Sequence, residues 1–399
     1  MRAPDRFRFR PPAIEFDRET RWCLLRAFGP PDHPCESGPV DPSRTVEVAN
    51  ALDVGARIAT RIPLATLQAE LGPDAARQLL IAQAWTRTMT ARAMTLAREV
   101  ATSIDALGAR GALLKGTALV ATGVADAGSR AIGDLDVLVA RETVPALQAA
   151  LIERGFAPIH TRRCEQHAIP LSRGQHELVE THVLLLGVRL EAQRTWADLP
   201  GLDASGHLLP VNGWPAAITV PDRGVMLAHL IAHGLAHHAY APGEYPLARI
   251  LQDLIDLDAH HLAGDDWEQV AAAVAGGISA RELRATTDLC AALAAGEPPA
   301  PASGSTDAHQ LLRHIVVGAL DPNYRKILQV LSLRELPLSG FRGVARNITD
   351  GVFLSRSQVD AIYGPQRSWL GYALLRLWRP FDLVRRTVLY GWRAVMQRR

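Results

Sequence analysis

Two aspartates stand two residues apart in the segment GSRAIGDLDVLVA, at positions 134 and 136. The apolar run 137–139 follows them directly and predicts a β-strand. Side chains at positions i and i+2 of a strand point to the same face, so Asp134 and Asp136 are expected to lie side by side. Adjacent ionised carboxylates repel one another unless a cation lies between them, and Mg²⁺ binds carboxylate oxygens together with substrate phosphates. The pair therefore predicts a divalent-metal site. The alternative is a solvated strand face, which many isolated Asp-x-Asp segments form.

The segment just upstream, LLKGTALV, predicts a strand, a Gly-Thr turn and the start of a helix. Gly116 lets the backbone approach a ligand closely, and Thr117 offers a hydroxyl group and helix N-terminal amides to a phosphate. Arg130 precedes the aspartates and its guanidinium is suited to bidentate contact with phosphate oxygens. These residues indicate a phosphate-binding loop beside the carboxylates. The alternatives are a plain turn glycine at 116 and ordinary surface charges at Lys115 and Arg130.

A further acidic residue is expected from the downstream segment HELVETHVLLL, which predicts another strand. Strand parity places His176, Glu180 and His182 on one face and Glu177 on the other. Glu180 is therefore the candidate third carboxylate, contributed by a neighbouring strand. A helical segment would change which residues face the site, and Glu177 would then be the competing candidate.

Taken together, these segments resemble the nucleotidyltransferase superfamily of DNA polymerase β-like folds, in which an acid pair on one strand is joined by a third acid on a later strand. More narrowly, LLKGTAL, GSRAIGDLDVLV and HELVETH are similar to a bacterial nucleotidyltransferase family that carries LKG, R-x-x-x-D-x-D and a later acid-x-His motif. The resemblance covers roughly residues 80–260. Thr117 stands where Ser or Gly is usual in the superfamily, and Glu180 where Asp is commoner.

The resemblance implies transfer of a nucleoside monophosphate from an NTP, with ATP the expected nucleotide, to a hydroxyl group on a small molecule, peptide or protein. Asp134 and Asp136 would hold two cations, Mg²⁺ or Mn²⁺, and Glu180 would help to hold the second. The phosphate- and nucleotide-binding residues that it implies are Lys115, Gly116, Thr117, Arg130 and His182. Two alternatives are a non-catalytic nucleotide-binding or regulatory module of the same fold, and a phosphate-transferring tailoring enzyme for a peptide natural product.

Another histidine cluster lies in HLIAHGLAHH, where His229, His233 and His237 share one helical face. The segment lacks the glutamate of a zinc-protease HExxH motif, and histidines at an interface between two helices are the ordinary alternative. In the resembling family a histidine-rich helix and a following R-x-x-x-D helix pack over the nucleotide site. The matching residues are Arg249 and Asp253, so we expect His233, Arg249 and Asp253 to contact nucleotide. The alternative for the last two is a routine i,i+4 ion pair.

Composition sets the wider frame. The chain has 399 residues, a formal net charge of +2 and four widely spaced cysteines, which favours a reducing cytoplasm over a disulfide framework. No signal peptide or transmembrane run is expected. The expected fold is α+β, a small mixed β-sheet nucleotidyltransferase core flanked by an N-terminal helical segment and a C-terminal helical domain. The expected divisions are an irregular segment 1–45, a nucleotidyltransferase-like domain with leading helices 46–205, a helical domain 206–330 and a C-terminal extension 331–399.

The C-terminal stretch 366–399 combines many arginines with tryptophan and tyrosine. This composition suits an anionic partner or peripheral binding at the inner face of the membrane. The alternative is that the aromatic side chains pack on the helical domain. Nucleic acid is not the expected partner, because the whole chain is not basic and no RNA-binding module is recognisable.

Overall fold

The computed structural model describes the greater part of the chain, and the description below is limited to that part. The described residues are 16–33, 39–159, 166–185, 187–190, 196–237, 247–259, 270, 280–297, 307–321, 371–375, 377, 378, 381 and 385. Most of the basic stretch 366–399 lies outside them, so its predicted membrane or anionic partner is not addressed by the structure. None of the described helices combines the length and the apolar character needed to cross a bilayer.

A mixed sheet of seven strands, in the order β3-β4-β5-β2-β1-β7-β6, forms the centre of one end of the molecule. Strand β2 is parallel to β5 and antiparallel to β1, and β1 is parallel to β7. All five residues of β2 are buried, as expected for a central strand that is covered on both faces. The strands are β1 (Gly111–Leu113), β2 (Leu135–Val139), β3 (Ala157–Pro158), β4 (Leu171–Arg173), β5 (Glu177–His182), β6 (Leu208–Pro210) and β7 (Ile218–Pro221).

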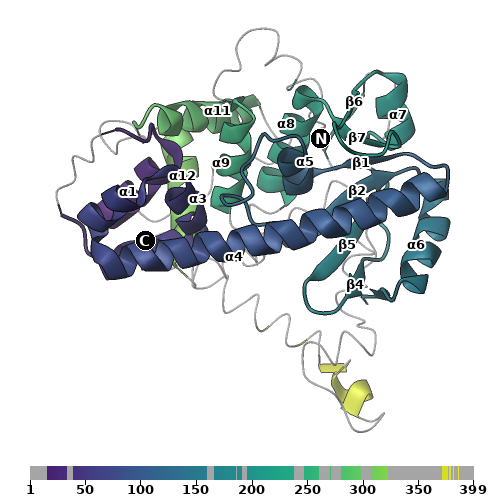
Figure 1. Cartoon of the computed structure of the whole chain (residues 1–399), viewed down its shortest axis with the longest axis horizontal. Helices are drawn as coiled ribbons and strands as arrows, with labels where there is room; N and C mark the ends of the chain where they lie inside the picture. Colours follow the sequence, from purple (N-terminus) through teal and green to yellow (C-terminus); the bar gives the residue numbers. More distant parts are fainter. Residues whose placement is uncertain are drawn as a thin grey trace.

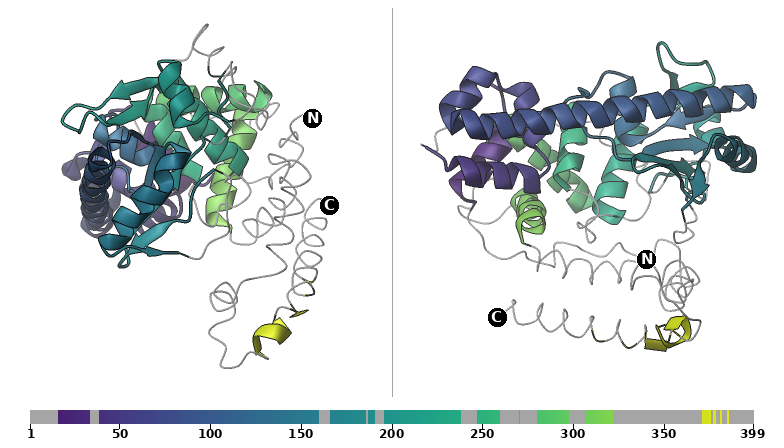
Figure 2. Two further views of the ribbon diagram at one scale, coloured as in Figure 1. Left: turned by 90° about the vertical axis from the view of Figure 1, so that its right-hand side faces the viewer. Right: turned by 60° about the horizontal axis from the view of Figure 1, so that its bottom comes forward.

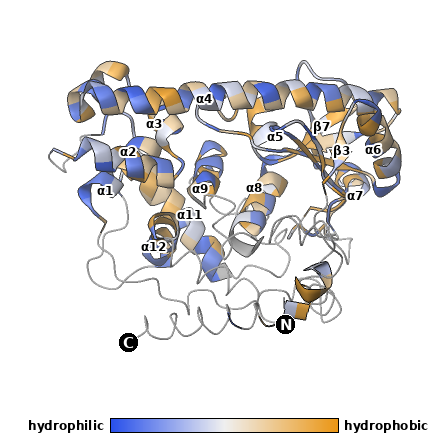
Figure 3. Ribbon diagram, turned by 90° about the horizontal axis from the view of Figure 1, so that it is seen from below, coloured by the Kyte–Doolittle hydropathy of each residue, from blue (hydrophilic) through white to orange (hydrophobic). Residues whose placement is uncertain are grey.

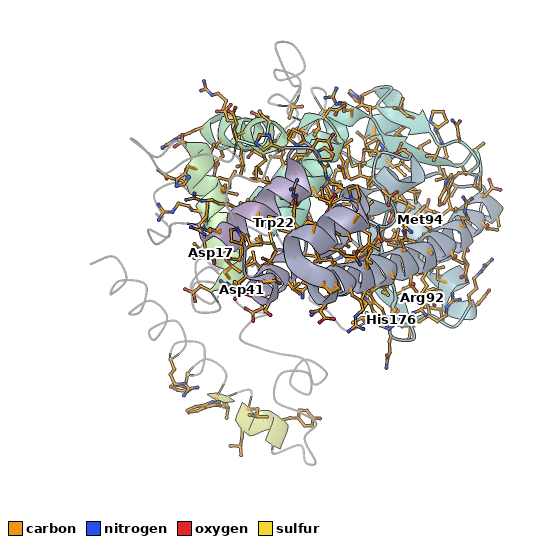
Figure 4. All side chains as sticks on the ribbon, turned by 60° about the vertical axis from the view of Figure 1, so that its left-hand side comes forward. Asp17, Trp22, Asp41, Arg92, Met94 and His176 are labelled. Atoms are coloured by element: carbon orange, nitrogen blue, oxygen red, sulfur yellow. The ribbon has the colours of Figure 1, made fainter. Side chains whose placement is uncertain are left out.

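The chain before the sheet is helical, and local sequence signals fix the ends of these helices. Asp17 and Asp41 cap α1 and α2 by accepting backbone N–H groups of the first turn (Figure 4). Gly72 has the left-handed φ of 79° that breaks α4 into two parts, and Pro73 begins the second part, where its fixed φ suits the first turn of a helix. The helices are α1 (Arg18–Phe28), α2 (Pro42–Ala51), α3 (Gly55–Arg61) and α4 (Leu64–Ala106).

The remaining helices either cover the sheet or follow it. They are α5 (Lys115–Ala121), the 3₁₀ turn η2 (Arg141–Thr143), α6 (Val144–Glu153), α7 (Leu199–Ala204), α8 (Arg223–Ile231), the π-helical η3 (Ala232–His237), α9 (Leu247–Asp256), α11 (Ala280–Ala294) and α12 (Asp307–Leu320).

Helix α4 runs along the fold from the sheet at one end to a group of helices at the other (Figure 1). Helices α1, α2 and α3 form that group with α11 and α12, which come from much later in the chain. Figure 2 shows the same grouping from two further directions. Helices α8 and α9 lie between the group and the sheet, on the side away from α4 (Figure 3).

Ion pairs join α9 to the N-terminal helices. Arg57 of α3 binds Asp256 of α9, with 2.8 Å between Nη2 and Oδ1, and only 3% of the arginine side chain is exposed. Arg249, also on α9, binds Asp53 in the turn between α2 and α3. Helix α9 is therefore joined to α3 and to the turn before it.

The predicted α+β fold, with a small mixed sheet and flanking helices, is confirmed. Two local predictions were wrong. Segment 1–45 was expected to be irregular, but it contains α1, which its aspartate cap and buried face stabilise. The chain from 206 onward was expected to be mostly helical, but β6 and β7 extend the sheet beyond residue 205. These strands are short, and β7 joins the sheet by parallel pairing with β1.

Candidate active site

The register between β2 and β5 places the central acidic residues side by side. Asp136 is directly opposite Glu180, and Leu138 is opposite His182. Because alternate residues share a face, Asp136, Glu180 and His182 lie on one face of the sheet. Asp134 comes just before β2 and continues this line of acidic residues (Asp134, Asp136 and Glu180), the acidic row. The strand assignment of HELVETH is thus confirmed, and with it the parity that separates Glu180 from Glu177.

Glu177 belongs to the opposite face, which helix α4 covers. Its carboxylate accepts from Arg173 Nε at 2.5 Å, and Arg173 also binds Glu99 of α4 at 2.7 Å. His176 lies outside β5, is exposed and stands edge-on to Trp85 of α4, with 6.4 Å between the ring centroids. The prediction that His176 shares the acidic face is therefore wrong, because the strand begins only at the next residue. Figure 4 shows His176 beside α4.

Lys115 reaches the acidic row from the other neighbouring strand. The chain after β1 stays beside β2, because Leu114 N–H donates to Asp136 O at 3.1 Å. Lys115 follows with a φ of 49°, a left-handed conformation that is disfavoured for residues other than glycine. Its ammonium is buried and donates to Asp136 Oδ1 at 2.8 Å. Lys115 is thus a partner of the aspartate and not the surface charge of the alternative prediction.

The same Asp136 oxygen has a second partner in His182. Nε2 of His182 lies 2.7 Å from Asp136 Oδ1 and 3.9 Å from Glu180 Oε2. Burial lowers the pKa of His182, so the imidazole is neutral and Nε2–H is the donor to the aspartate. His182 Nδ1 is buried without a hydrogen-bond partner among the described residues. The ring of His167 packs edge-on against His182 at 5.6 Å.

Burial and mutual repulsion make the acidic residues unequal. The ion pair with Lys115 and the bond from His182 outweigh burial at Asp136 and hold its pKa well below the usual value. The neighbouring Asp136 charge, together with burial, raises the pKa of Asp134. Burial raises the pKa of Glu180, and Asp136 adds to the effect. Asp134 and Glu180 therefore have too little positive charge around them to favour their ionised forms. A bound cation would supply that charge.

The donor set fits a divalent metal. One ligand atom from each of Asp136, Glu180 and His182 lies within 4.8 Å of the others, close enough to share one ion. Both hydrogen bonds to Asp136 end on Oδ1, and the described residues form none with Oδ2. Carboxylate oxygens are the ligands that Mg²⁺ and Mn²⁺ prefer. Asp134, the neighbour of Asp136 in the row, provides a further carboxylate.

Arg130 makes a different contact from the predicted one. Its Nε and Nη2 bind the two oxygens of Asp253 on α9, at 2.6 and 3.0 Å, and both side chains are buried. Gln252 of α9 donates to Ser129 O at 2.8 Å, and Thr90 of α4 donates to Arg130 O at 2.7 Å. The loop that leads to Asp134 is thus fixed from two helices. Nucleotide contact by Arg130 or Asp253 has no support from this buried pair, and Asp253 does not pair with Arg249 as the alternative prediction held.

Gly116 is explained by the same pair. A Cβ atom at position 116 would lie 3.0 Å from Cζ and Nη2 of Arg130, so the guanidinium packs flat against the glycine backbone. Its small size serves this contact between α5 and the loop. Thr117, the next residue, has a buried hydroxyl oxygen without a hydrogen-bond partner among the described residues.

We expect Gly116→Ala to destabilise the protein by about 1–3 kcal/mol, because the added methyl group must displace the Arg130 guanidinium. Gly133→Ala is the matched control, since a Cβ at 133 meets no atom within 4 Å and the residue is exposed. Its effect should stay within about 0.5 kcal/mol. Urea denaturation of both variants measures the difference. Equal stability of the two would show that the packing of Arg130 on Gly116 is unimportant.

The other residues predicted to contact nucleotide lie on α9 and on the histidine-bearing helix before it. Arg249 binds Asp53, with 3.0 Å between Nε and Oδ2, although its charge still acts on Asp134. The buried rings of His229 and His233 lie 5.7 Å apart, and the turn that carries His233 packs closely on α9. Contact of His233 and Arg249 with nucleotide remains a prediction. The side chain of His237 lies outside the described residues.

Two neighbours of the site were missed by the sequence analysis. His167 pairs with His182 in an isolated β-bridge, and its charge counteracts the raised pKa of Glu180. Asp53 has a left-handed φ of 58° and binds Arg249 from far away in the chain. Neither residue belongs to a recognisable motif. Only the fold brings them near.

One comparison with known proteins agrees with this geometry. A family model described as an uncharacterised nucleotidyltransferase matches residues 38–295, which is more than half of the chain. The chain belongs to this nucleotidyltransferase family. No curated protein and no solved structure matched the sequence. Membership indicates transferase activity with an NTP as substrate, and the matched region includes all the acidic residues of the site.

Proposed function

We propose that this nucleotidyltransferase moves a nucleoside monophosphate from an NTP, with ATP the expected nucleotide, to a hydroxyl acceptor in a reaction that depends on Mg²⁺ or Mn²⁺. The acidic trio (Asp134, Asp136 and Glu180) would hold the metal on a polymerase β-like core of the LKG and R-x-x-x-D-x-D type. The observation that carries the proposal is the register of β2 and β5, which sets Asp136 against Glu180 on one sheet face.

In the proposed reaction, the acceptor hydroxyl attacks the α-phosphate of the NTP. The acceptor oxygen forms a bond to the α-phosphorus, the bond between this phosphorus and the oxygen bridging to the β-phosphate breaks, and pyrophosphate leaves. The acceptor hydroxyl releases its proton to a Glu180 carboxylate oxygen, whose raised pKa suits a general base. A bound metal supplies charge neutralisation at the phosphates. Positioning and charge provide most of the catalysis in transfers of this type.

The remaining residues have supporting roles in this proposal. Lys115 and the hydroxyl of Thr117 contact the triphosphate, since both lie at the start of α5 next to the acidic row. His182 fixes the orientation of Asp136 through its 2.7 Å hydrogen bond. Arg130 positions the loop that carries Asp134, through its ion pair with Asp253. A protein, peptide or small molecule with a free hydroxyl group is the acceptor class.

The test uses two glutamates on the same strand. Purified protein is incubated with each α-³²P-labelled NTP and Mg²⁺ or Mn²⁺, and label transferred to protein or to added hydroxyl compounds is measured. We expect Glu180→Gln to lower transfer by at least about a hundredfold, because it removes a charged group that acts on the reacting atoms. Glu177→Gln is the matched control on the opposite face and should retain transfer.

Two outcomes would contradict the proposal. Label incorporation that persists unchanged in Glu180→Gln would remove the acidic trio from the chemistry. Absence of metal-dependent NTP binding by calorimetry in the wild-type protein would exclude nucleotidyl transfer at this site. The second outcome would also exclude the alternative of a non-catalytic module that binds nucleotide.

A further inference from the structure

We propose that Lys115 takes the place of one of the two divalent cations that the nucleotidyltransferase resemblance implies, so that the active site binds a single metal ion. The inference rests on the proposed function and deepens it, because it specifies how the negative charge of the site is neutralised. It starts from one contact, the buried ion pair between Lys115 and Asp136.

The ammonium occupies space that a second cation would need. Lys115 Nζ lies 2.8 Å from Asp136 Oδ1, and the side chains are 7% and 4% exposed. A divalent ion bound to the same oxygen would sit about 2.0–2.1 Å from it, and two like charges so close together repel strongly. Oδ2 of Asp136 forms no hydrogen bond with the described residues and is the oxygen available to one metal ion.

The backbone shows that this placement of the lysine is specific. A surface lysine keeps its charged end in water, whereas only 6% of Lys115 is exposed. Its φ of 49° is disfavoured for residues other than glycine and persists only where the surroundings require it. The glycine stands one position later and does not relieve this conformation. The chain therefore tolerates an unfavourable backbone conformation at the residue that brings the ammonium to Asp136.

The local charges are consistent with one metal. The acidic trio carries three negative charges and Lys115 carries one positive charge, which leaves the charge that a single divalent cation neutralises. Arg130 is paired with Asp253 and Arg249 with Asp53, so the charge of each arginine is offset locally, although both still act on Asp134.

Lysine is suited to this role by its chemistry. Its ammonium is a compact point charge with three N–H donors. One donor is used by Asp136, and the other two remain for oxygens of the triphosphate. The ammonium also stays in place whether or not a metal is bound, so it keeps Asp136 ionised and oriented in advance of substrate binding.

The experiment counts bound Mn²⁺ by the loss of the electron paramagnetic resonance signal of free Mn²⁺. Full-length protein is titrated alone and with one equivalent of α,β-methylene-ATP, which cannot transfer its nucleotide. We expect one bound Mn²⁺ per chain in both titrations. Lys115→Met removes the charge at similar length and should bind two, whereas Lys115→Arg keeps the charge and should bind one.

Two Mn²⁺ ions per wild-type complex would overturn the inference. A folded Lys115→Met variant that still binds one ion with unchanged affinity would also overturn it. If Lys115→Met does not fold, the wild-type count decides, with one ion in support and two against. Labelled-NTP assays separate this result from the proposed function: two ions with transfer contradict only the role of Lys115, and one ion without transfer contradicts only the function.

Discussion

Asp134→Asn is expected to abolish nucleotidyl transfer while leaving the protein at least as stable as the wild type. A metal ligand contributes several kcal/mol of charge stabilisation in the transition state, so the loss should be about a thousandfold or more. The fold should not suffer, because repulsion from Asp136 and burial raise the pKa of Asp134. A raised pKa means that the ionised form is disfavoured in the folded state. Below the folded pKa, Asp134 is protonated and this penalty is absent; as the pH rises through the folded pKa, the carboxyl ionises and the protein loses stability. The neutral amide of the Asp134→Asn variant carries no charge and avoids this loss at neutral pH.

Asp136→Asn is the contrasting variant, two residues away on the same face. It should lose transfer to a similar extent, but it should also destabilise the protein by about 3–5 kcal/mol. The reason is that Lys115 would remain as a buried charge without its carboxylate partner. The hydrogen bond from His182 would also weaken. Urea denaturation and the labelled-NTP assay on both variants measure the two effects. Equal destabilisation by the two substitutions would contradict the ion pair as the source of the difference.

An effect on stability as large as that of Asp136→Asn is expected from the buried pair between Arg130 and Asp253. Asp253→Leu alone should cost about 3–5 kcal/mol, because it removes the carboxylate that neutralises the buried Arg130 guanidinium. The double variant Arg130→Met/Asp253→Leu should recover most of this loss, since apolar side chains of similar size often replace buried ion pairs without cost. A double-mutant cycle in urea gives the coupling energy directly.

Transfer activity in the double variant tests what Arg130 does. If the residue only positions the loop before Asp134, activity should return to within about tenfold of the wild type once stability is restored. A stable double variant that remains more than about a hundredfold impaired would instead support the phosphate contact that the sequence predicts for Arg130. Single variants cannot make this distinction, because they lose stability as well.

The part of the site that rests on strand periodicity could be predicted from the sequence. Alternation in LDVLV and HELVETH is enough to predict which residues share a face within each strand, such as Glu180 with His182, and β2 and β5 confirm both strands. The register of β2 and β5 then places Asp136 and Glu180 on one face. The identity of the partners could not be predicted in this way. Asp253 lies 123 residues from Arg130 in the sequence, and nothing local links the two motifs. The sequence around Arg130 is equally compatible with a phosphate ligand.

Other errors have the same origin in long-range contacts. Strand β7 is held by parallel pairing to β1 more than 100 residues earlier, so its place in the sheet could not be predicted although Ile, Thr and Val favour a strand. Lys115 is 21 residues from Asp136, and only the neighbouring positions of β1 and β2 turn a nominal surface charge into a buried one. Sequence patterns thus identify the residues that carry charge, while the pairing between them depends on topology.

The position of α9 has a consequence for synthesis of the chain. On one side its Asp253 holds the loop of the acidic site, and on the other its Arg249 and Asp256 bind Asp53 and Arg57 near the start of the protein. Helices α2 and α3 leave the ribosome early but must wait for residue 256 before these charges are neutralised. Assembly of the catalytic centre is therefore a late event. A nascent chain that stops before α9 lacks the ion-pair partners of both the loop before Asp134 and the α2–α3 region.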